Sequence, residues 1–394
     1  YTKMVVPEGR FNAALIAYHI SILTSIVSIT QVPYTSLIMA HERMGIYAYI
    51  SIFEAVAKLL VVYLLSISHY DRLVVYAILI AIVQVVVAML YRLYCRRHFI
   101  ESKLQLIFDK GIFRSMMGFS GWNIMANLSE TLNLQGIIVL INLFFAPYVV
   151  AAQAIASQVS GTMMQFVNNF RTAINPQIIK LYAAGERDES KRLTLETTVY
   201  CFDLVLMLGL PTIVVMDKLM SVWLVKVPPY AVVFTQWIIV RQILGTFNAS
   251  FYIPMMAANK MRINSIASVL SGFVSFILLY ILFKLGCSPM WIQYICMLSA
   301  LFFSAIIKPY VLYRDINYSI GELVKCYWDC IKVLIVSCSI SLPVLLLDSS
   351  LLHSLIKVMI VLFAVMTSSY ICLEKTMKKR VVNIVISRLW NPIK

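Results

Sequence analysis

Charged residues are scarce in this sequence: Asp, Glu, Lys and Arg make up only 13% of the 394 residues, whereas hydrophobic residues make up 61%. A soluble domain averages about half apolar and about a quarter charged residues. The mean hydropathy is +0.85, and no long hydrophilic stretch interrupts the chain. This composition excludes a soluble globular protein and predicts an all-α polytopic integral membrane protein.

Sequence patterns that accompany catalysis are also lacking. The chain holds no HExxH, GxSxG or Walker A motif and no DxD-type acidic cluster. Its five His and eight Cys residues are dispersed, without the spacing of a zinc site. We therefore expect a protein that is not an enzyme and that uses no cofactor or metal ion. Without ATP-binding machinery, any uphill transport would have to draw on an ion gradient or a partner.

Apolar segments long enough to cross a bilayer recur along the whole sequence. They predict eleven spans, at residues 11–40, 47–68, 73–92, 117–143, 148–173, 198–219, 231–257, 264–284, 290–312, 330–347 and 352–373. The connections between them are short and are marked by Pro, Gly or charged residues.

Lys and Arg residues gather in alternate connections between the predicted spans. One set of connections holds 21 of them and the opposite set holds 6. Because cytoplasmic loops are enriched in Lys and Arg, the first set is predicted to be cytoplasmic, together with the C-terminus. Membrane topology thus accounts for the net charge of +15, and no nucleic-acid partner is expected.

Two basic segments on the predicted cytoplasmic side have the pattern of amphipathic helices. They are residues 96–114, with Ile100, Leu104 and Ile107 on one face, and residues 378–390. Such helices commonly lie in the headgroup plane of a membrane. An ordinary connector is the alternative for the first segment.

Polar side chains accumulate on the predicted span 148–173. At 100° per residue, one arc of about 80° carries Gln153, Ser157, Ser160, Asn168 and Arg171. The neighbouring arc carries Gln158, Thr162, Gln165, Asn169 and Thr172. The opposite side, which we expect to face lipid, carries Ala152, Ile155, Ala156, Val159, Met163, Phe166, Val167 and Phe170.

The preceding span has a polar face of its own, formed by Asn123, Asn127 and Glu130. Amides often serve only to bond helices to one another in membranes. Two consecutive helices with long polar stripes, one with a carboxylate and one with a guanidinium, instead predict a hydrated cavity.

The further charges within predicted spans include Glu54, Lys58, Asp203 and Arg241. Glu54 and Lys58 are four residues apart, with the Glu first, which is the favoured orientation for a helical ion pair. Asp203 and Arg241 are isolated. Arg241 keeps its proton at any ordinary pH, so it needs an anion, a cavity or another partner.

Four stretches of the chain resemble the Wzx-type polysaccharide flippases of the multidrug/oligosaccharidyl-lipid/polysaccharide (MOP, MATE-like) exporter superfamily. They are PYTSLIMAHERMGIYAYISIFEAVAKLL, SGWNIMANLSETLNLQGIIVLINLFFAP, AAQAIASQVSGTMMQFVNNFRTAINPQIIKLYAAGERDES and WLVKVPPYAVVF. The similarity is most specific from Pro33 to Ala258 and thins in the last two spans.

The resemblance implies two six-helix lobes around a central cavity that opens alternately to each side of the bacterial inner membrane. The implied substrate is an undecaprenyl-pyrophosphate-linked oligosaccharide, and membrane lipids and glycan polymerase machinery are further expected partners. The residues expected to contact the substrate are Arg171, Asn168, Asn169, Gln165, Gln158, Gln153, Arg241, Asn123 and Asn127. The candidates for coupling to H+ or Na+ are Glu130, Asp203, Glu54 and Lys58.

The expected domain organisation follows from this family and from a weak internal repeat. The segment around Pro33 recurs around Pro254, after three spans that have no counterpart before Pro33, so three helices are expected to precede Tyr1 in a fourteen-span parent. The expected parts are 1–92, the remainder of the N-terminal lobe; 93–116, an amphipathic linker; 117–313, the C-terminal lobe; 314–373, two accessory spans; and 374–394, a basic cytoplasmic tail.

Two alternative functions are considered as well. A MATE-like drug or lipid exporter should tolerate the loss of Arg171, because organic cations gain nothing from a guanidinium. A polymerase or scaffold of glycan assembly should carry a long loop outside the membrane.

Overall fold

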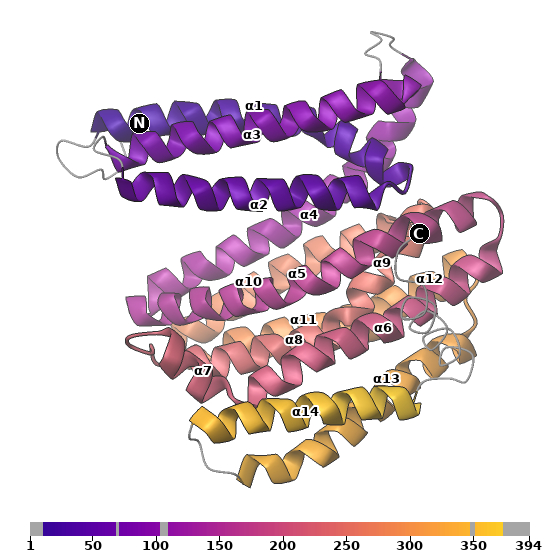
Figure 1. Cartoon of the computed structure of the whole chain (residues 1–394). Helices are drawn as coiled ribbons and strands as arrows, with labels where there is room; N and C mark the ends of the chain where they lie inside the picture. The colour runs from indigo at the N-terminus through magenta and orange to yellow at the C-terminus, as the bar shows by residue number, and fades with distance from the viewer. Residues whose placement is uncertain (1–10, 68–70, 103–108, 347–350, 373–394) are drawn as a thin grey trace, which may run out of the picture. The chain divides into compact units, whose positions relative to one another are not determined.

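The computed structural model describes residues 11–67, 71–102, 109–346 and 351–372, and all regular structure within them is helical (Figure 1). The chain divides into two compact units, unit 1 at Tyr1–Phe108 and unit 2 at Asp109–Lys394. The division falls inside the segment 93–116 that the sequence suggests as a linker.

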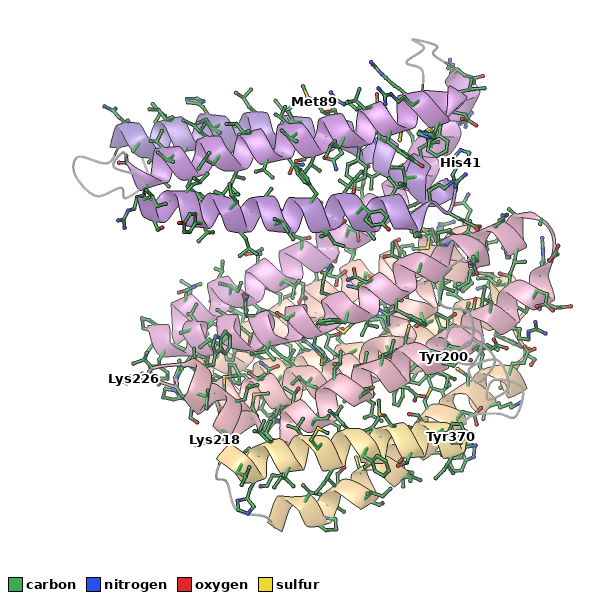
Figure 2. The ribbon with its side chains drawn as sticks, in the orientation of Figure 1. His41, Met89, Tyr200, Lys218, Lys226 and Tyr370 are labelled. Atoms are coloured by element: carbon green, nitrogen blue, oxygen red, sulfur yellow. The ribbon has the colours of Figure 1, made fainter. Side chains whose placement is uncertain are left out.

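The described residues of unit 1 form three long helices and a short turn. The helices are α1 (Phe11–Ala40), α2 (Met44–Ile67) and α3 (Arg72–His98), and the 3-10 turn η1 (Ile100–Ser102) follows. Helix α3 packs along both α1 and α2. The small core of the unit is formed by Ile38, Ile50, Val87, Tyr91, Cys95 and Phe99. Many large apolar side chains are exposed, such as Met89 on α3 (Figure 2), as expected for helices that face lipid.

Unit 2 contains the remaining helices. In chain order they are α4 (Lys110–Phe144), α5 (Pro147–Ala183), α6 (Arg187–Val214), α7 (Met216–Trp223), α8 (Ala231–Ser250), α9 (Tyr252–Ala257), α10 (Arg262–Lys284), α11 (Trp291–Phe302), the π-helix η2 (Phe303–Ile307), α12 (Lys308–Ile316), α13 (Ile320–Ser341), the 3-10 turn η3 (Leu342–Leu346) and α14 (Leu351–Cys372).

Helices α5, α6 and α8 pack against one another at the centre of unit 2. Helix α4 pairs with α10, and α13 and α14 pack together against α6 (Figure 1). The main core draws on α5 to α9 and α12 to α14, and its members on α6 and α8 include Phe202, Val205, Leu206, Ile239 and Phe247. Gly209 lets α6 and α8 approach closely, since a Cβ atom there would lie 2.8 Å from Cγ2 of Ile239.

Polar side chains bond α4 to α10 in the interior of unit 2. The Ser129 hydroxyl donates to the Ser268 carbonyl over 3.1 Å, and the Asn133 amide donates to the Gly272 carbonyl over 3.3 Å. Hydrogen bonds of this kind between helices are common in membrane proteins, because the bilayer supplies no water to satisfy the groups.

Within the described residues, eight helical segments are long and apolar enough to cross a membrane. These helical segments are Phe11–Ala40, Met44–Ile67, Arg72–His98, Met116–Phe144, Arg187–Val214, Arg262–Lys284, Trp291–Ile316 and Leu352–Cys372. The prediction of a multi-pass all-α membrane protein is thereby confirmed. Helices α5, α8 and α13 are not among the eight, and each of them carries polar or charged side chains along its length. The number of eleven spans stays a prediction.

Two predicted spans are interrupted. The span predicted at 231–257 is divided into α8 and α9, because Pro254 has no N–H to donate to the carbonyl four residues earlier. The span predicted at 290–312 is formed by α11, η2 and α12, with a π-helical turn in the middle. The segment Trp291–Ile316 as a whole is still long and apolar enough to cross a membrane, and only the breaks within the two spans were not predicted.

The predicted interfacial helix 96–114 is also not one helix. Residues 96–98 form the last turn of α3, where the negative end of the helix dipole stabilises three basic side chains. The turn η1 follows, and α4 begins at Lys110. Residues 103–108 lie outside the described residues, as does the second predicted amphipathic segment, 378–390.

Candidate functional site

Most of the apolar side of α5 faces protein, although Phe166 is exposed. Ala152, Ala156, Met163 and Val167 are buried, and α5 packs against α6 and α8. The expectation that this whole side faces lipid was therefore wrong. Lipid tails and a protein core are equally apolar, so an apolar stripe alone does not distinguish between them.

The other side of α5 exposes a row of amides. Gln158, Gln165, Asn168 and Asn169 are all exposed. Gln165 donates to Asn169 over 3.4 Å, a contact within the helix. Exposed amides in a membrane protein need water or polar partners, because hydrocarbon offers neither. We call these four residues the amide face.

Arg171 lies at the edge of the amide face and points into the protein. Only 6% of the residue is exposed, and its guanidinium donates to the Thr246 carbonyl of α8 over 3.5 Å and to the Asn168 side-chain oxygen over 3.4 Å. It also lies beside the Cys201 thiol of α6. No carboxylate among the described residues pairs with it, and its Nε has no hydrogen-bond partner there. A buried guanidinium without an anion is costly, and Asn168 connects it to the exposed amides.

The remaining predicted residues of α5 and α8 contact other helices. Gln293 of α11 donates to the Gln153 side chain over 2.9 Å, and Gln242 of α8 donates to Ser160 over 3.1 Å. Arg241 is half-buried and lies beside the Cys296 thiol of α11. Gln153 thus takes part in packing α5 against α11. Arg241 contacts α11 and Arg171 contacts α6, so the two guanidinium groups do not share a partner among the described residues.

Helix α4 presents Asn127 and Glu130 on an exposed face. The side chain of Asn123 lies outside the described residues. The polar residues of α4 thus divide by role, since Ser129 and Asn133 bond to α10 while Asn127 and Glu130 stay exposed.

A buried lysine that the sequence analysis did not single out lies near Glu130. Lys308, the first residue of α12, is only 2% exposed, and its Nζ lies 4.6 Å from the centroid of the Tyr252 ring on α9. The Glu130 carboxylate interacts electrostatically with both side chains. The available signal was a single Lys inside the apolar run LFFSAIIKPYVLY. Charges inside such runs usually have functional partners.

The π-helix η2 directly precedes Lys308. A π-helix departs from the regular α-helical hydrogen-bond pattern, and such turns often occur at functional sites. The freed Ser304 carbonyl accepts a hydrogen bond from the Tyr327 hydroxyl of α13. This bond stabilises the irregular turn next to the buried lysine.

The other candidates for ion coupling lie apart from Arg171. Asp203 is half-buried on α6 and interacts with Ser369 of α14, whereas Arg171 reaches α6 at Cys201, on the other side of the helix. Glu54 and Lys58 form an ion pair of 2.6 Å on α2 in unit 1. Within the described residues, no group of three or more His, Cys, Asp or Glu side chains is placed to hold a metal ion.

Comparisons with known proteins do not add a function to this site. The sequence matches no protein-family model, and no curated protein is similar enough to count as a relative.

Proposed function

We propose that the chain is a flippase for undecaprenyl-pyrophosphate-linked oligosaccharides in the bacterial inner membrane. It would work by alternating access in a MATE-like two-lobe bundle, coupled to an ion gradient, with the C-terminus in the cytoplasm. The observation that carries the proposal is the amide face of α5. Four exposed amides on a helix whose opposite side is mostly buried support a hydrated surface for a polar substrate in an otherwise apolar protein.

The chemistry of the amide face suits an oligosaccharide. Each Asn or Gln side chain carries both donors and an acceptor, and sugar hydroxyls need both. In this proposal Gln158, Gln165 and Asn169 bind the glycan, and the polyprenyl tail stays in the bilayer. Arg171 binds the pyrophosphate once Asn168 releases it, because a guanidinium pairs bidentately with phosphate oxygens.

Glu130 and Lys308 are the proposed coupling pair. A carboxylate that takes up a proton or a sodium ion no longer stabilises the nearby ammonium group, so ion binding changes the charge balance around Tyr252. Such a change at the irregular turn η2 provides a link between an ion gradient and helix movement.

The test is transport by the whole chain in proteoliposomes. A lipid-linked oligosaccharide with a fluorescent headgroup is supplied, and a membrane-impermeant quencher reports how fast it changes leaflet. The test variant is Gln165→Leu with Asn169→Leu, which removes both partners of one hydrogen bond. The matched control is Asn142→Leu with Gln177→Leu, which removes two exposed amides outside the amide face.

We expect the test variant to lose most transport and the control to keep it. Equal transport by the test variant and the wild type, at equal protein amounts, would reject the amide face as the substrate surface. Export of organic cations without movement of the glycolipid would favour a drug exporter. Growth of the glycan without movement between leaflets would favour a polymerase.

A further inference from the structure

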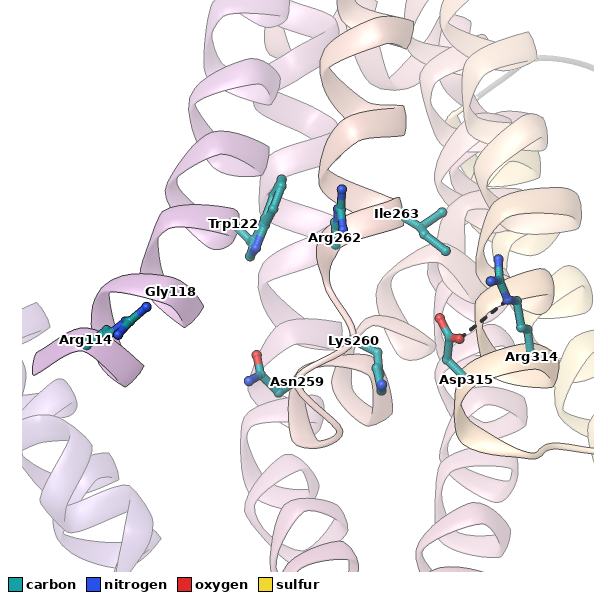
Figure 3. A pocket seen from close by; sticks show the side chains of 9 residues that line it. All are labelled: Arg114, Gly118, Trp122, Asn259, Lys260, Arg262, Ile263, Arg314 and Asp315. Carbon is teal, nitrogen blue, oxygen red and sulfur yellow. Dashed lines mark ion pairs between the residues drawn. The ribbon is translucent and has the colours of Figure 1, made fainter. Parts of the chain in front are cut away.

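A basic pocket opens at one end of unit 2, and none of the four residues of the amide face lines it. Its volume is about 640 Å³. Figure 3 shows the residues that line it, which come from α4, the α9–α10 turn, α10 and α12: Arg114, Gly118, Trp122, Asn259, Lys260, Arg262, Ile263, Arg314 and Asp315.

The charge of the pocket is strongly positive. Arg114, Lys260, Arg262 and Arg314 contribute four cations, against the single carboxylate of Asp315. Among the residues that the structure describes, Asp315 pairs only with its neighbour Arg314, at 3.9 Å. Within the described part of the chain, Arg114, Lys260 and Arg262 make no ion pair. Four cations around one cavity repel one another, so an anion bound among them would be stabilised.

The walls of the pocket are held in place by the surrounding structure. The Ser265 hydroxyl donates to the Trp122 carbonyl over 2.8 Å and so joins α10 to α4. The Arg262 guanidinium lies 5.9 Å from the centroid of the Trp122 ring. Asn259 adopts a left-handed conformation with φ of 55°. The turn around it is closed by a hydrogen bond from the Lys260 N–H to the Met255 carbonyl. The contact between Trp122 and Arg262 thus forms one side of the cavity, and the closed turn at Asn259 forms another.

The pocket lies at the ends of membrane-crossing helices. Three of the eight apolar segments, Met116–Phe144, Arg262–Lys284 and Trp291–Ile316, have an end beside it. Its cations belong to the predicted cytoplasmic set. Lys218 and Lys226, of the opposite set, lie near α7 at the other end of unit 2 (Figures 1 and 2). Basic pockets between helices at the cytoplasmic surface are suited to phosphate-bearing headgroups.

We propose that this pocket binds a phosphate group at the cytoplasmic surface of the membrane. The phosphate oxygens would lie among Arg114, Lys260 and Arg262, and Trp122 would contact the adjoining part of the ligand. The phosphate belongs to a lipid headgroup or to a free phosphate ion, and the experiment distinguishes the two sources. The proposal does not depend on flippase activity, because binding is measured without transport.

The experiment measures binding by the purified whole chain in nanodiscs of zwitterionic lipid. The probes are phosphatidylglycerol, a short-chain polyprenyl pyrophosphate and inorganic pyrophosphate, with phosphatidylcholine as the uncharged reference. The test variant is Arg114→Gln, Lys260→Gln and Arg262→Gln. The control is Arg43→Gln, Arg96→Gln and Arg97→Gln, which removes three exposed charges of the same predicted side in unit 1.

We expect the test variant to bind its best probe about a hundredfold more weakly, since each cation at such a surface contributes about fivefold. The control should bind within about twofold of the wild type. Tight binding of either lipid probe would identify a headgroup as the source, and binding of inorganic pyrophosphate alone would identify a free anion. Equal losses in test and control, or no loss in the test variant, would overturn the proposal.

A second variant separates shape from charge. A Cβ atom at Gly118 would meet no atom within 4 Å, so Gly118→Leu extends into the cavity without changing its charge. We expect this variant to keep its unfolding temperature and to bind the best probe at least about tenfold more weakly, because the larger side chain occupies the ligand's space. Unchanged binding would mean that the ligand lies outside the pocket and would overturn the proposal.

Discussion

The ammonium group of Lys308 lies 4.6 Å from the centroid of the Tyr252 ring, with only 2% of the lysine exposed. A desolvated cation over an aromatic face is stabilised by about 2 kcal/mol. The contact joins α9 to α12, and the charge of Glu130 on α4 acts on both groups.

Replacement of Tyr252 tests the energetic value of this contact. Tyr252→Leu removes the ring, whereas Tyr252→Phe keeps it. We expect the Leu variant to be less stable than the Phe variant by about 1–2 kcal/mol, because only the Phe variant retains the cation–π contact. The measurement is equilibrium unfolding in detergent. If the two variants have the same free energy of unfolding, the ring does not stabilise Lys308.

Replacement of Arg171 separates a role in transport from a role in packing. We expect Arg171→Lys to transport at a reduced rate and Arg171→Ala to fall at least about tenfold, because lysine keeps the charge but not the bidentate geometry. Transport is measured in proteoliposomes at matched protein amounts, and unfolding is measured in parallel. A fall in unfolding temperature in step with transport would show that the guanidinium only joins α5 to α8.

Single cysteines report the environment of the two sides of α5. We expect Gln158→Cys, Gln165→Cys and Asn169→Cys to react with a polar, membrane-impermeant thiol reagent, because the amide face is hydrated. Ala152→Cys and Ala156→Cys should resist it, since both positions are buried. Protection at all five positions would indicate that lipid or protein covers the amides. The background is a variant without its eight natural cysteines.

Gly209 and Gly161 form a matched pair for testing helix packing. Gly209→Ala places a Cβ atom 2.8 Å from Ile239 Cγ2, and we expect a loss of about 1–3 kcal/mol from overpacking. Gly161→Ala meets no atom within 4 Å, so we expect no loss and a gain of up to about 1 kcal/mol in helix propensity. Thermal unfolding of both variants is the measurement. Equal stability would mean that α6 and α8 are not in close contact at Gly209.

Reporter fusions test the predicted membrane orientation. A fusion after Lys226 should lie outside the cytoplasm and a fusion after Lys379 inside it, because basic residues concentrate in the first set of connections, to which Lys379 belongs. Both reporters on the same side would contradict this topology and, with it, the cytoplasmic position of the basic pocket.

Much of the fold could be predicted because the apolar runs exceed what a soluble protein tolerates. The long helices at 11–40 and 264–284 are found almost as predicted, at Phe11–Ala40 and Arg262–Lys284. The breaks were harder to predict. Pro254 marks the interruption after α8. The π-helix η2 is directly followed by Lys308 and Pro309, but these residues do not by themselves predict a π-helical turn.

The sequence by itself determined that the chain is a multi-pass helical membrane protein and that α5 carries amides on one side. Only the tertiary structure decided that the apolar side of α5 packs against α6 and α8, that Arg171 points into the core and that Lys308 reaches Tyr252. The basic pocket likewise exists only once α4, α10 and α12 meet. The physical reason is that periodicity records which face of a helix is apolar or polar, whereas lipid, core and cavity are distinguished by which helices come to lie against that face.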